Sequence, residues 1–152
     1  MLLLLLQVNF FDVDYTAEKL SKESSNFFHH NVAKRLFLCK QARPDIQTAV
    51  AFLCTRVKSP NIDDYKKLGR VMNYLQSNPS LPLTLEADSS GILNWWVDAA
   101  YAVHPDMKGY TGGALSRGTG VIYGTSTKQK LVTRSSTEAE LVGIHDVLPQ
   151  II

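Results

Sequence analysis

The stretch RSSTEAEL at residues 134–141 places two carboxylates, Glu138 and Glu140, near the start of a predicted helix. At about 100° per residue their side chains project about 160° apart, so the two acids cannot serve one site. A carboxylate on an apolar stripe is costly unless a cation receives it. We therefore expect Glu140 to be a candidate metal ligand, and Glu138 to face away with His145 and Asp146. Glu140 shares its apolar sector with Leu141, Ile144, Val147, Leu148 and Ile151.

Glu138 has a structural explanation. Ser135 and Glu138 have the spacing of a capping box, in which the serine accepts a hydrogen bond from one free backbone N–H and the glutamate accepts from another. A second register pairs Thr137 with Glu140 and would make Glu140 the capping residue instead. We favour the first register because it leaves Glu140 available for a cation.

Asp98 is the other acid in apolar surroundings. It lies in WWVDAAYA, a predicted strand where aspartate is disfavoured by propensity and by desolvation. A solvent-facing position on a half-buried strand is the alternative explanation. Magnesium prefers oxygen ligands, so a strand carboxylate and a helix carboxylate that converge would suit this ion. Asp98 and Glu140 are therefore the candidate pair.

Three helices are predicted between Ser24 and Ser77. Residues 43–45 (RPD) begin the second, because a proline early in a helix loses no internal hydrogen bond and an acid favours the first turn. Residues 59–61 (SPN), followed by two aspartates, begin the third, and residues 77–79 (SNP) end it. The first helix carries apolar side chains at helical spacing, namely Phe28, Val32, Leu36 and Cys39.

After Leu81 the pattern becomes strand-like. Leu81, Leu83 and Leu85 alternate with other residue types, and residues 92–102 (ILNWWVDAAYA) are rich in apolar and aromatic side chains. Residues 111–126 predict a hairpin around Ser116-Arg117-Gly118, where glycine can adopt the positive φ of a tight turn.

Composition sets limits on the class of protein. The chain has 152 residues and a formal net charge of +2, with its cations spread out, which is compatible with nucleic acid as a partner without requiring it. Cys39 and Cys54 lack the spacing of a zinc site or a disulfide scaffold, so we expect reduced, buried thiols in an intracellular protein. The opening MLLLLL is too short to span a bilayer. We expect it to be a buried strand end or a by-product of where the reading frame begins, and we expect no membrane partner.

Several motifs follow one another in an order that indicates a family. WWVDAAYAVHPD, TGGALSRGTGVIYGTSTKQK and SSTEAEL together resemble the start of the RNase H domain of copia-type (Ty/copia) retrotransposon Pol polyproteins. FHHNVAKRLFLCKQARPDIQTAVAFLCTRV and YKKLGRVMNYLQ resemble the segment that joins the reverse transcriptase to that domain. We therefore expect a poorly ordered N-terminal tail at 1–26, a helical connection segment at 27–80 and a truncated RNase H-like domain at 81–152.

The resemblance implies a ribonuclease-H-like α/β fold, in which a mixed sheet opens with three antiparallel strands and a helix then packs on it. The family hydrolyses the RNA strand of an RNA–DNA hybrid with two magnesium ions, one helping to activate water and the other stabilising the leaving oxygen. By motif, Asp98 matches the first metal-ligand aspartate of the family and Glu140 matches its glutamate. The implied partners are an RNA–DNA hybrid or another nucleic acid, and the remainder of the Pol polyprotein.

The sequence also departs from the family pattern. A third metal-binding aspartate is expected on the strand after the helix, whereas this sequence stops at Ile152. Asp146 projects about 120° away from Glu140, and Asp106 is expected to be a loop acid, so neither replaces it. Two carboxylates bind magnesium weakly, so we expect an inactive fragment. The alternative is a catalytically dead remnant or connector that at most binds nucleic acid.

A candidate phosphate-contacting patch lies between the predicted hairpin and the last helix. It contains Lys128, Lys130 and Arg134, with Gln129 between the two lysines. A solvated loop is the alternative explanation for this patch.

Two further pairs have residue types that could bind a ligand. Trp95 and Trp96 point to opposite faces of a strand, so we expect one in the core and the other on the surface or stacked on a base. His29 and His30 diverge by about 100° on a helix, which argues against a shared metal ion.

Overall fold

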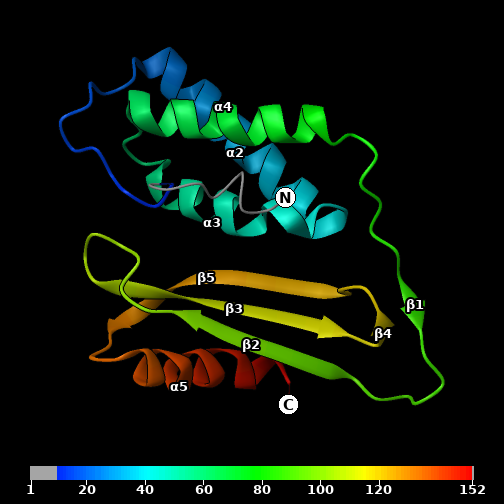
Figure 1. Ribbon diagram of the computed structural model, residues 1–152. Helices are drawn as coiled ribbons and strands as arrows, with labels where there is room; N and C mark the ends of the chain where they lie inside the picture. Colours follow the sequence, from blue (N-terminus) through cyan, green and yellow to red (C-terminus); the bar gives the residue numbers. More distant parts are fainter. Residues whose placement is uncertain (1–9, 152) are drawn as a thin grey trace. The chain divides into compact units, whose positions relative to one another are not determined.

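The computed structural model describes residues 10–151 (Figure 1). The chain forms two compact units that divide after Leu81. The described part combines helices with antiparallel sheets, which confirms the coarse prediction of a mixed α/β chain. The prediction for MLLLLL falls on residues outside the described range.

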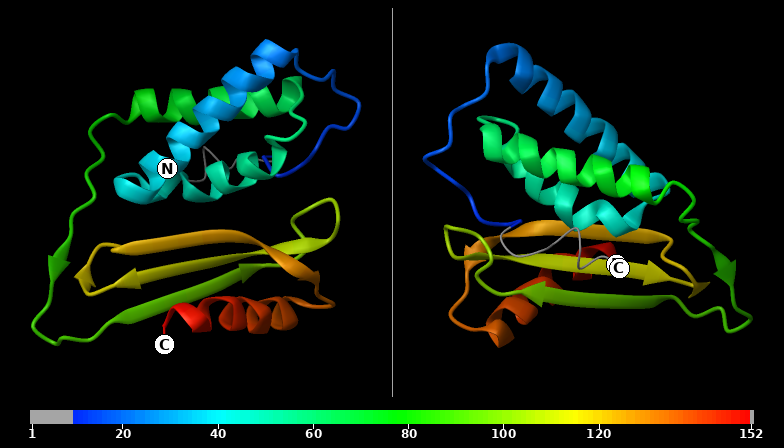
Figure 2. Two further views of the ribbon diagram at one scale, coloured as in Figure 1. Left: turned by 180° about the vertical axis from the view of Figure 1, so that it is seen from behind. Right: turned by 45° about the horizontal axis from the view of Figure 1, so that its top comes forward.

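The first unit is helical (Figures 1 and 2). Its helix α2 (Lys22–Gln41) packs on both α3 (Gln47–Arg56) and α4 (Ile62–Ser77). The predicted apolar stripe of the first helix is confirmed at three of its four positions, whereas Leu36 is 39% exposed. The core of this unit includes Phe28, Val32, Ile46, Val50, Phe52, Leu53, Leu68 and Val71.

The second predicted helix begins later than expected. Residues 44–46 form a single turn, η1 (Pro44–Ile46), and α3 then starts at Gln47. The guanidinium of Arg43 donates two hydrogen bonds to the Asp45 carboxylate, at 2.9 and 2.8 Å. This side-chain pairing spans the turn, so the RPD signal marks the approach to the helix.

The start of α4 is fixed by a buried capping box. Asn61 Oδ1 accepts from the backbone N–H of Asp64 at 2.9 Å, and Asp64 Oδ2 accepts from the backbone N–H of Asn61 at 3.0 Å. Arg56 Nε reaches the same carboxylate at 3.1 Å. The predicted SPN start signal is therefore confirmed, and the buried carboxylate is both hydrogen-bonded and neutralised.

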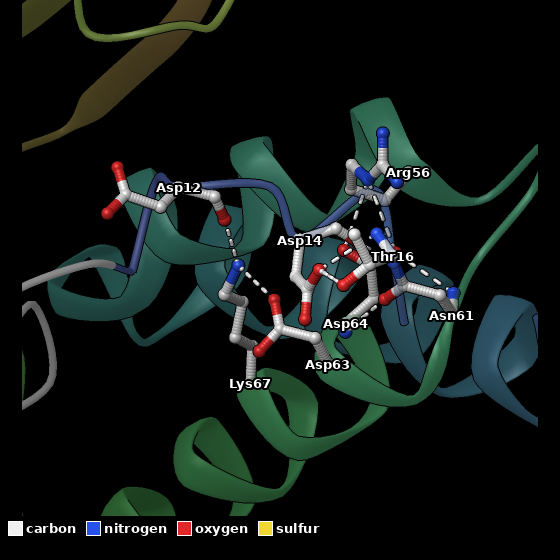
Figure 3. A network of polar contacts seen from close by, with 8 residues as sticks. All are labelled: Asp12, Asp14, Thr16, Arg56, Asn61, Asp63, Asp64 and Lys67. Carbon is white, nitrogen blue, oxygen red and sulfur yellow. Dashed lines mark hydrogen bonds and ion pairs between the residues drawn. The ribbon is translucent and has the colours of Figure 1, made fainter. Parts of the chain in front are cut away.

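The described part of the predicted N-terminal tail, from Phe10 onward, makes defined contacts with the first unit. The Phe10 side chain is buried, and the backbone N–H of Ile62 donates to Glu18 O at 2.9 Å. Asn61 Nδ2 donates to Asp14 O at 2.7 Å, and Lys67 Nζ donates to Asp12 O (Figure 3). Sequence periodicity could not reveal this segment, because it takes part through its own backbone carbonyls, which any residue carries.

The second unit contains a three-stranded antiparallel sheet in the order β2-β3-β5. The strands are β2 (Asn94–Ala100), β3 (Lys108–Ser116) and β5 (Tyr123–Val132), and α5 (Ser136–Val147) packs mainly on β2 and β3. A short turn, η2 (Leu148–Gln150), follows α5. The predicted order of three antiparallel strands and then a helix is therefore observed.

Two parts of the strand prediction need correction. The predicted strand at 81–85 is absent, and only β1 (Glu86–Ala87) forms, paired with β4 (Gly118–Thr119). Alternation supplies no partner by itself, and Pro82 has no N–H to donate. The β3–β5 connection is also wider than the predicted tight turn, although Gly118 does adopt a positive φ of 95°.

Helix α5 uses a different face from the one predicted. Ala139, Gly143 and Val147 are its buried residues. Leu141 is 63% exposed and Ile144 50%, so the predicted apolar sector is wrong except at Val147. A Cβ on Gly143 would lie 3.4 Å from the Ala99 Cβ, which shows how closely the helix approaches the sheet. Small side chains permit this approach, and side-chain size overrode hydrophobicity in selecting the face.

We expect the capping box at Asn61 to contribute to the stability of the first unit. Asn61→Ala removes the side-chain acceptor for Asp64 N–H and the donor to Asp14 O, so we expect about 1–2 kcal/mol less free energy of unfolding. Urea unfolding of the whole chain, followed by far-ultraviolet circular dichroism, measures this. Asn73→Ala, an exposed substitution on the same helix, is the control. Equal stability of the two variants would show that the cap contributes nothing.

Candidate metal centre and nucleic-acid interface

Asp98 lies on the face of β2 opposite α5. Ala99 contacts α5 at Gly143, and neighbouring strand residues point to opposite faces. The Asp98 side chain is exposed, and its Oδ1 accepts from the backbone N–H of Ala99 at 2.9 Å. Its partner across the strand pair is Gly112, which adds no side chain to that face. The alternative of a solvent-facing strand residue describes this position.

Glu140 lies in the first turns of α5, next to the buried Ala139, and is exposed. Because α5 covers the Ala99 face of the sheet, Glu140 and Asp98 occupy different sides of it. The described residues contain no group of three or more His, Cys, Asp or Glu side chains arranged to hold a metal ion. In this register, Asp98 and Glu140 therefore do not converge on one ion.

The capping register at the start of α5 is that of Ser135 and Glu138. The Ser135 hydroxyl accepts from the backbone N–H of Glu138 at 3.2 Å, which confirms the favoured register. The Glu138 carboxylate accepts from the backbone N–H of Arg134 at 2.7 Å, one residue before the cap itself. Glu138 is thus engaged in the helix terminus, as predicted.

Asp146 and Gln129 lie where the sequence did not place them. Asp146 was expected to face away, but it is half-buried and its Oδ2 accepts from the Thr111 hydroxyl at 3.4 Å. Gln129 was expected in a phosphate patch, but it is buried, and its Nε2 donates to Thr111 Oγ1 and to Ala139 O at 3.2 and 2.8 Å. These two side chains tie β3, β5 and α5 together, a role that neither periodicity nor charge predicts.

The residues of the predicted phosphate patch have different surroundings. Lys128 Nζ pairs with Asp106 Oδ2 at 2.7 Å. Lys130 and Arg134 are exposed. Lys130 lines a pocket of about 490 Å³ that also presents the carboxylates of Glu138 and Asp146. These acids oppose the approach of a phosphate, so the electrostatics of the patch are mixed.

Asp106 is a loop acid, as predicted. Burial raises the pKa of its carboxyl, but the hydrogen bond and charge of Lys128 lower it more, so the net pKa lies below its ordinary value. A depressed carboxyl pKa stabilises the fold above the unfolded-state pKa, and this stabilisation is lost as pH falls through the folded-state value. The pair is largely exposed, so its contribution is about 0–1 kcal/mol.

The two tryptophans lie on opposite faces of β2 and the two histidine side chains diverge on α2, as their spacing in the sequence predicts. Trp95 is half-buried and meets the Tyr123 ring edge-to-face at a centroid distance of 6.1 Å, whereas Trp96 is 66% exposed. The ring centroids of His29 and His30 lie 6.1 Å apart, and His30 Nδ1 is 2.8 Å from Asn26 O. Trp96 is thus the tryptophan available for stacking.

Both cysteines in the described part are free thiols. Cys39 is buried and Cys54 half-buried, and burial raises the pKa of each thiol. Both are therefore protonated at neutral pH and poor nucleophiles. As for membranes, none of the helices within residues 10–151 has the length and apolar character needed to cross a bilayer.

The chain is similar to retrotransposon polyproteins. It is 36% identical over 99 residues, 64% of this chain, to a retrovirus-related Pol polyprotein from transposon RE2 of Arabidopsis thaliana, and covers 7% of that protein. It is 30% identical over 99 residues to an uncharacterized mitochondrial protein of the same plant, covering 41% of it. The chain thus spans less than half the length of either relative.

A third similarity covers more of its relative. A secreted RxLR effector protein of Plasmopara viticola is 28% identical over 118 residues, which are 77% of this chain and 83% of the effector. No protein-family profile matches the chain. No solved structure matches it either.

We expect the ion pair with Lys128 to control the pKa of the Asp106 carboxyl. Lys128→Gln removes the largest of the effects that lower its pKa, so we expect that pKa to rise toward its ordinary value. Carboxyl-carbon NMR titration of the whole chain measures it. Lys130→Gln is the control, because Lys130 lies two residues further along β5 and outside this ion pair. An unchanged Asp106 pKa in Lys128→Gln would show that the two side chains do not pair in solution.

Proposed function

We propose that this chain is a segment of a retrotransposon Pol polyprotein, spanning the connection after the reverse transcriptase and the start of a ribonuclease-H-like domain. The similarity to Pol polyproteins over 99 residues supports the origin. The order of three antiparallel strands followed by a helix supports the position within the polyprotein. Its partners are then nucleic acid and the remainder of the polyprotein, in an intracellular setting.

In the longer polyprotein, the activity we propose is hydrolysis of the RNA strand of RNA–DNA hybrids. Magnesium is the proposed metal, with Asp98 and Glu140 among its ligands. Both carboxylates would share one side of the sheet only if β2 were shifted by one residue against β3, because such a shift turns every side chain of the strand to the other face. The proposed ligand set therefore requires a register that differs from the pairing of Asp98 with Gly112.

For the chain by itself we propose nucleic-acid binding without hydrolysis. The single observation that argues against hydrolysis by the chain alone is the separation of Asp98 and Glu140 by the sheet, since a divalent ion needs its oxygen ligands within one coordination shell.

The whole chain, mixed with an end-labelled RNA–DNA hybrid and Mg²⁺, should bind the hybrid and leave the RNA intact. Binding should weaken markedly between about 50 and about 200 mM salt, because phosphate contacts release counterions. A gel-shift assay and a denaturing gel of the same samples report binding and cleavage. RNA cleavage, or binding indifferent to salt, would contradict this proposal.

The longer polyprotein tests the catalytic assignment. Asp98→Asn or Glu140→Gln in that protein should abolish magnesium-dependent RNA cleavage, because each removes a charged oxygen ligand. Asp88→Asn, at an exposed acid whose carboxylate accepts hydrogen bonds from Ser90 in its own turn, is the matched control and should cleave normally. Unchanged cleavage in either ligand variant removes that residue from the site.

A further inference from the structure

A groove of about 660 Å³ lies in the first unit, on α2 with one wall from α4. Its apolar lining includes Phe37 and Leu38 of α2 and Leu75 of α4. His30, Lys34 and Arg35 of α2 add basic groups to the same groove. The exposed lining of the groove is almost entirely apolar, and the basic residues belong to the same helix that forms it.

The charge around this groove is not neutralised locally. Residues 24–44 contain no aspartate or glutamate, and neither do residues 65–85. Arg35 Nη1 donates to the neutral amide of Asn31 at 3.0 Å. Within the described part of the chain, neither Lys34 nor Arg35 forms an ion pair, and Arg35 Nε is a buried donor without an acceptor. None of the residues that line the groove is acidic, so an anion in contact with the groove would meet the basic side chains first.

The apolar part of the groove includes a solvent-exposed aromatic side chain, Phe37. Phe37 is 70% exposed, whereas Phe28 on the same helix is fully buried. Exposing a phenylalanine in water forfeits its burial energy. An exposed aromatic ring beside cations is the arrangement that binds single-stranded nucleic acid, in which a base stacks on the ring and the phosphates contact the basic side chains.

We propose that the α2 groove binds single-stranded nucleic acid, with a base against Phe37 and phosphate oxygens against Lys34 and Arg35. This inference rests on the proposed function, which selects nucleic acid over an acidic peptide as the anionic partner. It adds a site in the helical unit and a strand preference. A duplex cannot supply the same contact, because its base faces are already stacked on one another.

Binding of a fluorescein-labelled oligothymidylate to the whole chain, followed by fluorescence anisotropy, tests the stacking contact. Phe37→Ala should weaken binding about tenfold, the effect of losing one base–aromatic stack. Tyr15→Ala is the matched control, because Tyr15 is 74% exposed in the same unit but outside the groove. Circular dichroism of both variants shows whether the helices remain folded.

The phosphate contact has its own readout. Lys34→Gln should reduce the slope of log affinity against log salt by about 0.7, the value for one lost phosphate contact on a single strand. Lys22→Gln, at the first residue of the same helix and outside the groove, should leave the slope unchanged. A variant with an unchanged slope would show that Lys34 does not contact phosphate.

The outcomes separate this inference from the proposed function. If the chain binds hybrid and oligothymidylate but Phe37→Ala and Lys34→Gln bind as tightly as the parent, the groove is not the site and the proposed function stands. If the chain binds neither nucleic acid, both fail. Displacement of the oligothymidylate by a polyglutamate peptide in a Phe37-dependent manner would identify the groove as a peptide site and overturn the inference. A duplex whose binding is equally sensitive to Phe37→Ala would overturn the strand preference.

Discussion

The packing of α5 on the sheet decides on which side Asp98 and Glu140 lie. A Cβ built on Gly143 would lie 3.4 Å from the Ala99 Cβ and 3.5 Å from Thr111 Cγ2, so this face of the helix packs against these two residues. This contact assigns the Ala99 face of β2 to the interior. Strand alternation then commits Asp98 to the opposite face, and it follows that a carboxylate on α5 does not share a site with Asp98 while this register holds.

The features that could be predicted from sequence are those with a local cause. The start of α4 and the cap of α5 follow from side chains that bond to backbone groups three residues away, so Asn61 and Ser135 are recognisable without knowledge of the fold. Strand β2 follows from its short run of aromatic and apolar residues. For the two caps, residues near in sequence supply both partners of the interaction.

The features that were missed have partners distant in sequence. In the sequence, Gln129 lies between two lysines and therefore suggests a basic surface. In the fold, it is hydrogen-bonded to Thr111 and Ala139. The segment from Phe10 has no periodicity because its backbone bonds to the start of α4, as Figure 3 shows for Asp12 and Asp14. The face of α5 was misassigned because a helical wheel ranks residues by hydrophobicity, whereas a closely packed helix selects its face by size. Side-chain volume at Ala139 and Gly143 was visible in the sequence, but the surface it had to fit was not.

The two units differ in their local charge, although the net charge of the whole chain is small. The net charge of +2 is small, yet several acids of the first unit gather near the start of α4, where Asp63 and Asp64 pair with Lys67 and Arg56. The acid-free stretches at 24–44 and 65–85 then leave Lys34 and Arg35 with uncompensated charge. In the second unit Lys128 pairs with Asp106, and Lys130 lines a pocket together with Glu138 and Asp146. Because phosphate binding depends on local potential more than on total charge, the helical unit is the better candidate for nucleic-acid contact, although the acidic residues of the metal-site motif lie in the other unit.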